Sequence, residues 1–182
     1  MLDIFCRIGI ITVSALHSEP SGLPRLNGGS VAPEEVSWQF PVTRINLMFA
    51  IKTAVSDLQA KTFAFPAQKT MYGGKQIAKG DAIFIFASEN EGGPGLVARG
   101  VITSAKGVAR KPGIARQTPR VSITIRRTAC VKRRLGRSEL KRFSNWNDGG
   151  PETELNFKFY RQATNKIVGI SDKAAAFLRR FF

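Results

Sequence analysis

The sequence predicts an α+β fold, a small mixed β-barrel with short helices packed on its openings. Short runs of strand-forming residues are interspersed with short helical patterns along the chain. Residues 121–125 alternate strictly between apolar and polar side chains, which is typical of a strand with one face in water. Residues 81–88 contain two isoleucines alternating with two phenylalanines, so both faces of that strand are apolar. We therefore expect 81–88 to lie at the centre of the fold, buried on both sides.

The length and composition favour a single domain. A chain of 182 residues, 43% of them hydrophobic, accommodates one full core. Residues 1–37 are rich in proline, glycine and serine, so we predict a disordered extension there and one domain over 38–182. No run approaches the roughly 20 apolar residues of a membrane helix, which excludes a transmembrane span. Cys6 and Cys130 lack the clustering of a zinc site, and we expect two reduced thiols in a cytoplasmic protein.

The first half of the domain is predicted to begin with a strand at 40–49 and an amphipathic helix at 51–60. Residues 61–74 contain a proline and a glycine pair, so they form a strand fragment or an ordered loop. Two β-prone runs, 81–88 and 95–103, flank a glycine-rich cluster. This pattern predicts a β-hairpin.

The second half is predicted to alternate strands and helices. Pro151 suits the first position of a helix, while Ser138 and Ser171 are expected to cap a helical turn and a helix. The expected elements are a basic loop at 105–119, a strand at 121–131, a helical turn at 138–143, a helix at 151–162, a strand at 166–170 and a helix at 172–182.

Charge is the strongest compositional signal, because the net charge is +15 and residues 106–142 hold 13 basic side chains against one acid. Such a concentration indicates a nucleic-acid binder, the alternative being a solubilising basic surface. The predicted phosphate-binding residues are Arg110, Lys111, Arg116, Arg126, Arg127, Lys132, Arg133, Arg134 and Arg137.

Signals for catalysis are weak. The single histidine, His17, falls in the predicted extension, so no catalytic triad or Cys/His pair can form in the domain. The glycines at 92–95 lie within a hairpin and lack the Lys-Ser/Thr of a phosphate-binding loop. Pairs such as Glu89 and Glu91 are typical of solvated turns. We expect no enzyme, cofactor or metal.

Aromatic residues next to basic ones could hold a base by stacking. Trp146 follows the basic run in a polar loop, where it either plugs the core or forms a pocket wall. Asn145 beside it offers a donor and an acceptor to a base edge. Tyr72 lies at another loop tip, where it is either structural or a second aromatic wall. Arg99 lies within an apolar strand, so its guanidinium needs a partner or an opening to water.

A segment of the chain resembles the EVE domain, a member of the PUA-like group that includes the ASCH and YTH domains. The motifs are Tyr72-Gly73-Gly74, the strand entry Lys79-Gly80-Asp81, Ser88 after the apolar strand, and the return strand GLVARGVI at 95–102. The resemblance is good over 72–104 and loose over 44–170. The entry motif lacks one intervening residue of the commonest form, and Trp38 precedes residues 44–49 by several residues, whereas family members often have a tryptophan within the first strand.

The resemblance implies a helix-wrapped β-barrel with a pocket that holds a modified base turned out of DNA or RNA. It implies that Ser88 and Arg99 line or flank this pocket. With Trp146, Tyr72 and Asn145 they are the candidate base-pocket residues.

Two other functions are kept as alternatives. The basic face could dock an acidic protein partner. A metal-dependent nuclease would instead need converging carboxylates, for which the candidates are Asp81, Glu89, Glu91 and Asp148.

Overall fold

The computed structural model describes residues 48–161 and 165–182. Within them six strands form a closed barrel in the order β1-β3-β4-β5-β2-β6. This confirms the predicted fold class of a small mixed barrel with short helices. The predictions for 1–37, including His17, and for most of the strand at 40–49 lie outside the described residues. The strands are β1 Met48–Thr53, β2 Thr62–Met71, β3 Ala82–Ala87, β4 Gly95–Gly107, β5 Arg120–Cys130 and β6 Lys166–Ile170.

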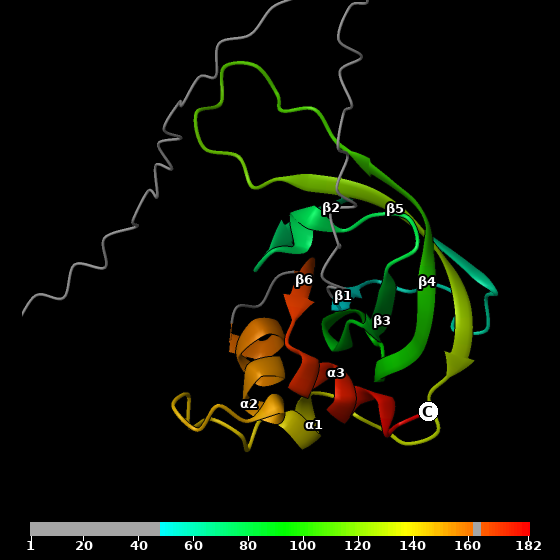
Figure 1. The fold of residues 1–182 in the computed structure, drawn as a ribbon, viewed down its shortest axis with the longest axis vertical. Coiled ribbons are helices and arrows are strands. Elements are labelled where there is room, and N and C mark those ends of the chain that lie inside the picture. The colour runs from blue at the N-terminus through cyan, green and yellow to red at the C-terminus, as the bar shows by residue number, and fades with distance from the viewer. Residues whose placement is uncertain (1–47, 162–164) are drawn as a thin grey trace, which may run out of the picture. The chain divides into compact units, whose positions relative to one another are not determined.

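The α-helices gather on one side of the barrel, beside β6 and β3, while the hairpin of β4 and β5 extends its loop at the other end (Figure 1). None of the helices in the described part of the chain has the length and apolar character that crossing a bilayer requires. The helical segments are η1 Gly74–Gln76, η2 Glu89–Glu91, α1 Arg137–Leu140, α2 Pro151–Asn156, the π-helical turn η3 Phe157–Arg161 and α3 Asp172–Arg179.

The strand β3 separates two hydrophobic clusters, as its sequence predicts. Ile83 and Ile85 point into the barrel with the inward residues of the other strands. Phe84 and Phe86 point outward and pack against α1, α2, η3 and α3. Burial of both faces therefore fixes β3 between the barrel interior and the helical layer, and positions Ser88 at its end.

Glycine is required where β4 begins. Gly95 has φ 91°, and a Cβ there would lie 2.5 Å from the carbonyl oxygen of Leu135. Any side chain would clash with backbone as well as strain the left-handed conformation. The glycine that opens the return-strand motif is thus explained by close packing.

The expected helix at 51–60 is wrong. β1 continues to Thr53 because Ile51 and Thr53 pair with Ile85 and Ala87 of β3, and residues 54–61 form turns and bends. Tertiary pairing outweighs the weak helical spacing here.

Two helix boundaries also differ from prediction, whereas a third is confirmed. The expected cap at Ser138 is wrong, because α1 is preceded by Gly136, whose N–H donates to Glu139 Oε2 at 2.6 Å. The helix beginning at Pro151 changes into the π-helical turn η3 at Phe157. Ser171 does cap α3, its Oγ accepting from the N–H of Ala174 at 3.1 Å.

Candidate functional site

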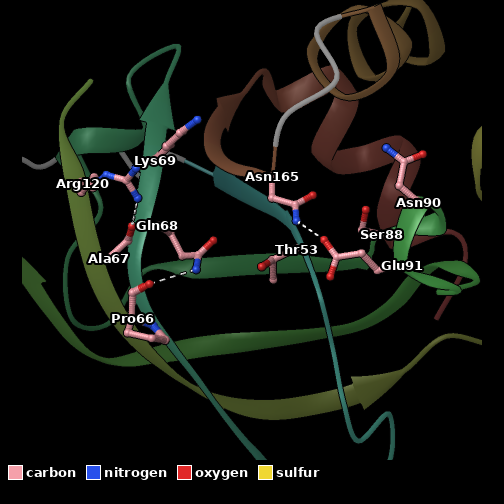
Figure 2. Close-up of a pocket in the computed structure, with 10 residues that line it drawn as sticks. All are labelled: Thr53, Pro66, Ala67, Gln68, Lys69, Ser88, Asn90, Glu91, Arg120 and Asn165. Carbon is pink, nitrogen blue, oxygen red and sulfur yellow. Dashed lines mark hydrogen bonds between the residues drawn. The ribbon is translucent and has the colours of Figure 1, made fainter. Parts of the chain in front are cut away.

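A polar cavity of about 480 Å³ opens at the mouth of the barrel, where the ends of β1, β3 and β6 face the middle of β2. We call it the Ser88 cavity. Figure 2 shows two walls, one formed by β2 with the start of β5 and the other by the last residue of β1, residues that follow β3 and the residue before β6. The lining residues are Thr53, Pro66, Ala67, Gln68, Lys69, Ser88, Asn90, Glu91, Arg120 and Asn165.

The β2 wall is a bulge. The register with β5 shifts between Phe65 and Gln68, and Ala67 has φ 47°, a left-handed conformation that alanine adopts at a cost. Hydrogen bonds hold it there: the Ala67 N–H donates to Ser122 Oγ at 2.9 Å, and an Arg120 guanidinium N–H donates to the Ala67 carbonyl at 2.7 Å. The bulge thereby brings Gln68 and the basic Arg120 to the cavity, and a strained backbone of this kind is typical of functional sites.

The opposite wall contains an unsatisfied hydroxyl. Ser88 is 1% exposed, and its Oγ has no hydrogen-bond partner among the described residues. Its backbone is fully held, since the Ser88 N–H donates to the Thr53 carbonyl and its own carbonyl accepts from the N–H groups of Glu91 and Gly93. A buried hydroxyl without a partner costs about 1–3 kcal/mol, so this rigid position calls for a functional explanation.

The carboxylate of Glu89, next to Ser88, is satisfied on both oxygens. Oε1 accepts from the Tyr160 hydroxyl at 2.6 Å and from the Arg137 N–H at 2.9 Å. Oε2 has no hydrogen bond but lies 3.2 Å from Lys52 Nζ, so an ion pair meets its charge. Lys52 Nζ also lies 4.1 Å from the centre of the Tyr160 ring. The expectation that Glu89 marks a solvated turn is therefore wrong.

Titration properties follow from this network. Burial by itself would raise the pKa of Glu89, but the Tyr160 hydrogen bond, backbone hydrogen bonds and the charge of Lys52 together bring it below its ordinary value. Burial, and then the hydrogen bond to the Glu89 carboxylate, raise the pKa of Tyr160. Lys166 pairs with Lys52 in the register of β6 and β1, and burial together with the charge of Lys52 lowers its pKa. The network keeps Glu89 ionised at neutral pH.

The aromatic candidates lie outside the Ser88 cavity. Trp146 is 39% exposed and contacts Phe157 edge-on with ring centres 5.6 Å apart, so it does not plug the core. Tyr72 is also exposed and lies 6.1 Å from the same Phe157 ring. Asn145 is exposed, and its Oδ1 accepts from the N–H of Asn147 at 3.4 Å. The structure brings Trp146 and Tyr72 together through Phe157, but away from the residues that line the Ser88 cavity.

Arg99 also lies apart from the Ser88 cavity. It is exposed on the outer face of β4, which has neighbours on both sides, and its guanidinium lies 5.5 Å from the centre of the Phe182 ring. Water and this ring satisfy the need for a partner that the sequence indicated. The geometry separates Arg99 from Ser88, with which the resemblance grouped it.

The predicted phosphate-binding residues fall into three groups along the hairpin. Arg110, Lys111 and Arg116 are exposed in the loop between β4 and β5. This loop ends beside the cavity, since the Thr70 N–H and hydroxyl both donate to the Pro119 carbonyl at 2.9 Å. The second group is Arg126 and Arg127 on β5, and the third comprises Lys132, Arg133, Arg134 and Arg137 near α1 and α3.

The second and third groups are partly engaged within the protein. Arg127 donates to the Leu58 carbonyl at 3.2 Å, and Arg133 donates to the Arg180 carbonyl at 2.7 Å. Arg134 Nε lies 3.6 Å from Glu139 Oε1. The first group is exposed in a loop that ends beside the cavity, and is therefore best placed to extend its positive edge.

The carboxylates named for a nuclease do not converge. Glu89 is bound in its own network, and Glu91 Oε1 accepts from Asn165 Nδ2 at 2.8 Å. Asp81 accepts from the Ala78 N–H, and Asp148 accepts from Gly150 and Thr153 around the start of α2. Within the described residues no group of histidine, cysteine and carboxylate side chains has the arrangement of a metal site.

Several lining residues were missed at the sequence level. Gln68, Lys69 and Arg120 reach the cavity only because β2 bulges at Pro66, and Asn165 reaches it because β6 closes the barrel. A proline inside a strand pattern is a signal for such a bulge. Nothing comparable in the sequence indicates the position of Asn165.

Comparison with known proteins finds solved structures that share the fold of this chain. No family model matches the sequence, and no curated protein is similar to it. A crystal structure of human THYN1 in complex with DNA containing 5-methylcytosine superposes with a TM-score of 0.52 at 16% identity, over 72% of this chain and 95% of that one. The DUF55 domain of human thymocyte nuclear protein 1 gives a TM-score of 0.50 at 16% identity and the same coverage.

The chain is similar in fold to the DUF55 domain. A Pseudomonas putida protein shares this fold, with a TM-score of 0.50 at 12% identity over 74% of this chain and 98% of that one. The DUF55 fold is the PUA-like barrel of EVE domains, so the fold implied by the sequence resemblance is confirmed.

Proposed function

We propose that this protein is a non-enzymatic nucleic-acid-binding module that receives one everted base in the Ser88 cavity. The observation that carries the proposal is the buried Ser88 hydroxyl, held without a partner in a polar cavity that has Lys69 and Arg120 at its edge. A group that enters the cavity would satisfy this hydroxyl. Binding would thus recover the desolvation cost that folding leaves uncompensated.

The cavity has the chemistry of a base-edge reader. Three side-chain amides, those of Gln68, Asn90 and Asn165, supply both donors and acceptors, and the Glu91 carboxylate supplies an acceptor. Such groups distinguish bases by the pattern on their edges. A volume of about 480 Å³ falls within the usual range of small-molecule sites, so one base fits. Eversion costs a few kcal/mol, least for a mismatched, modified or unpaired base.

Affinity comes from phosphates on the positive edge. Lys69 and Arg120 would hold those nearest the everted base, and Arg110, Lys111 and Arg116 would continue the contact along the hairpin loop. Phosphate contacts position the strand and the cavity discriminates. THYN1, which shares the fold, was crystallised with DNA containing 5-methylcytosine, and this supports a nucleic-acid ligand with a modified base.

Salt-dependent binding tests the proposal. Fluorescence anisotropy with single-stranded and duplex oligonucleotides would compare the Lys69→Ala/Arg120→Gln variant with a matched control, Lys173→Ala/Arg99→Gln, whose residues are exposed away from the cavity. Each lost phosphate contact reduces the slope of log K against log salt by about 0.7 to 0.9. We expect a reduction of about 1.4 to 1.8 for the cavity variant and no change for the control. Equal slopes in both variants would contradict the phosphate assignment.

A further inference from the structure

A second cavity, of about 270 Å³, lies where the loop after α1 meets the start of α2. Its lining residues are Trp146, Gly149, Gly150, Thr153, Glu154 and Phe157, none of which lines the Ser88 cavity. Figure 1 shows that the loop between α1 and α2 stands out from the helical side of the barrel. This site is therefore distinct from the one described above.

Three aromatic rings form a row at this cavity. Phe157 contacts both of the other rings: its ring centre lies 5.6 Å from that of Trp146 and 6.1 Å from that of Tyr72, which does not itself line the cavity. Trp146 and Tyr72 are 39% and 38% exposed, among the largest exposures of the hydrophobic side chains described. Exposed aromatic rings that lie together are a feature of binding surfaces.

The charges around the row select the kind of ligand. The Arg161 guanidinium is exposed and lies 4.9 Å from the Trp146 ring centre and 5.4 Å from that of Phe157. Glu154 is already bound by Lys158 at 2.7 Å and by Ser171, so its negative charge is neutralised. A cationic ligand would therefore meet the positive charge of Arg161 here. A planar ligand that carries negative charge fits both the rings and Arg161, and a nucleotide has both properties.

Two consecutive residues, Asn165 and Lys166, lie next to the Ser88 cavity and the Tyr72 ring respectively. Lys166 Nζ lies 5.7 Å from the Tyr72 ring centre, and the neighbouring Asn165 lines the Ser88 cavity.

We propose that Trp146, Phe157 and Tyr72 form a stacking track for the unpaired bases that flank the everted base, with Arg161 contacting the phosphate or the base face. This proposal rests on the proposed function and extends it from one nucleotide to a single-stranded segment. Stacking contributes affinity without reading sequence, because every base has a π-face.

Tryptophan fluorescence tests the track directly. The chain contains two tryptophans, so a Trp38→Phe variant leaves Trp146 as the sole indole. A single-stranded oligonucleotide of mixed sequence is titrated into this variant while its own label reports binding by anisotropy. We expect quenching of the Trp146 emission that saturates together with the anisotropy. Oligonucleotide binding without quenching would overturn the stacking track and leave the proposed function standing, whereas absence of any anisotropy change would overturn both.

Substitution provides the second readout. Trp146→Ala should weaken oligonucleotide binding by about 5- to 150-fold, the range for losing one stacked base, while Trp146→Phe should retain most of the affinity. Equal losses in the Ala and Phe variants, with both variants shown to be folded by circular dichroism, would contradict stacking.

Discussion

Ser88 and Glu89 are neighbours in the chain with opposite surroundings. The Glu89 carboxylate is met by Tyr160, Arg137 and Lys52, all within 3.2 Å. The Ser88 hydroxyl is more deeply buried and has no partner among the described residues. One peptide bond separates a polar group that the fold satisfies from one that it leaves unsatisfied.

The contrast separates stability from binding. Glu89 ties η2 to β1, α1 and η3, and so joins the barrel to the helical layer. Ser88 ties nothing through its side chain, yet it is held in place by backbone hydrogen bonds. The two residues should therefore respond differently to substitution, Glu89 in the free energy of unfolding and Ser88 in affinity.

The largest expected effect is that of Glu89→Ala. Removing the carboxylate leaves Lys52, whose side chain is 6% exposed, without its counter-charge. Breaking a buried pair by removing one partner costs about 3–5 kcal/mol. Urea denaturation followed by circular dichroism would measure this loss.

Glu91→Ala is the matched control for stability. Glu91 belongs to the same turn but is exposed and contacts only Asn165 among the interactions described. We expect a change within about 0.5 kcal/mol, as for other surface substitutions. Equal destabilisation by both variants would show that the Glu89 carboxylate stabilises the fold no more than the exposed Glu91 carboxylate does.

The pH dependence of stability should follow the same network. The pKa of Glu89 is lowered in the folded protein, so folding favours its ionised form. That contribution is fully present above the ordinary pKa of 4.5 and is lost as the pH falls through the folded value. Unfolding free energies measured between neutral pH and acid should decline below about pH 4.5.

The matched variant for this effect is Glu89→Gln. It should be less stable at neutral pH and should show a shallower acid decline, because one titrating carboxylate is gone. The remaining slope belongs to Glu154 and Glu139, whose pKa values are also lowered by hydrogen bonds despite burial. An unchanged acid decline in this variant would show that the partners of Glu89 do not lower its pKa in the folded protein.

The basic residues of the loop between β4 and β5 should affect binding and leave stability unchanged. Replacing Arg110, Lys111 and Arg116 together by glutamine should reduce the salt slope for single strands by about 2, at about 0.7 for each contact. Unfolding free energy should not change, because these side chains are exposed in the described structure. A full salt slope in this variant would place the phosphates elsewhere, for instance on the group near α1 and α3.

The sequence predicts the barrel better than the site. The alternation of Ile83 and Ile85 with Phe84 and Phe86 correctly predicts a central strand, since both faces of β3 are buried. The local pattern is sufficient there because successive side chains of a strand point to opposite faces, so apolar residues at every position indicate that both faces are buried. They fail at 51–60, where pairing of β1 with β3 decides the structure.

The site depends on contacts between distant segments, which composition cannot reveal. The sequence identifies Ser88 as a strand-end residue but groups it with Arg99 and Trp146, which face other surfaces. Closure of the barrel and the bulge at Ala67 bring Arg120 and Asn165 to Ser88 instead. A sequence-level view therefore recovers the chemistry of the residues more readily than their grouping.

Ser88→Ala tests the central claim most directly, because it removes one hydroxyl and little else. The variant should unfold at the same free energy as the unmodified protein or up to about 1 kcal/mol higher, since a buried group without a partner is lost. Its affinity for an oligonucleotide that presents an everted base should fall by about 3- to 10-fold, the worth of one hydrogen bond. Loss of stability with unchanged affinity would contradict the account and make Ser88 a structural residue.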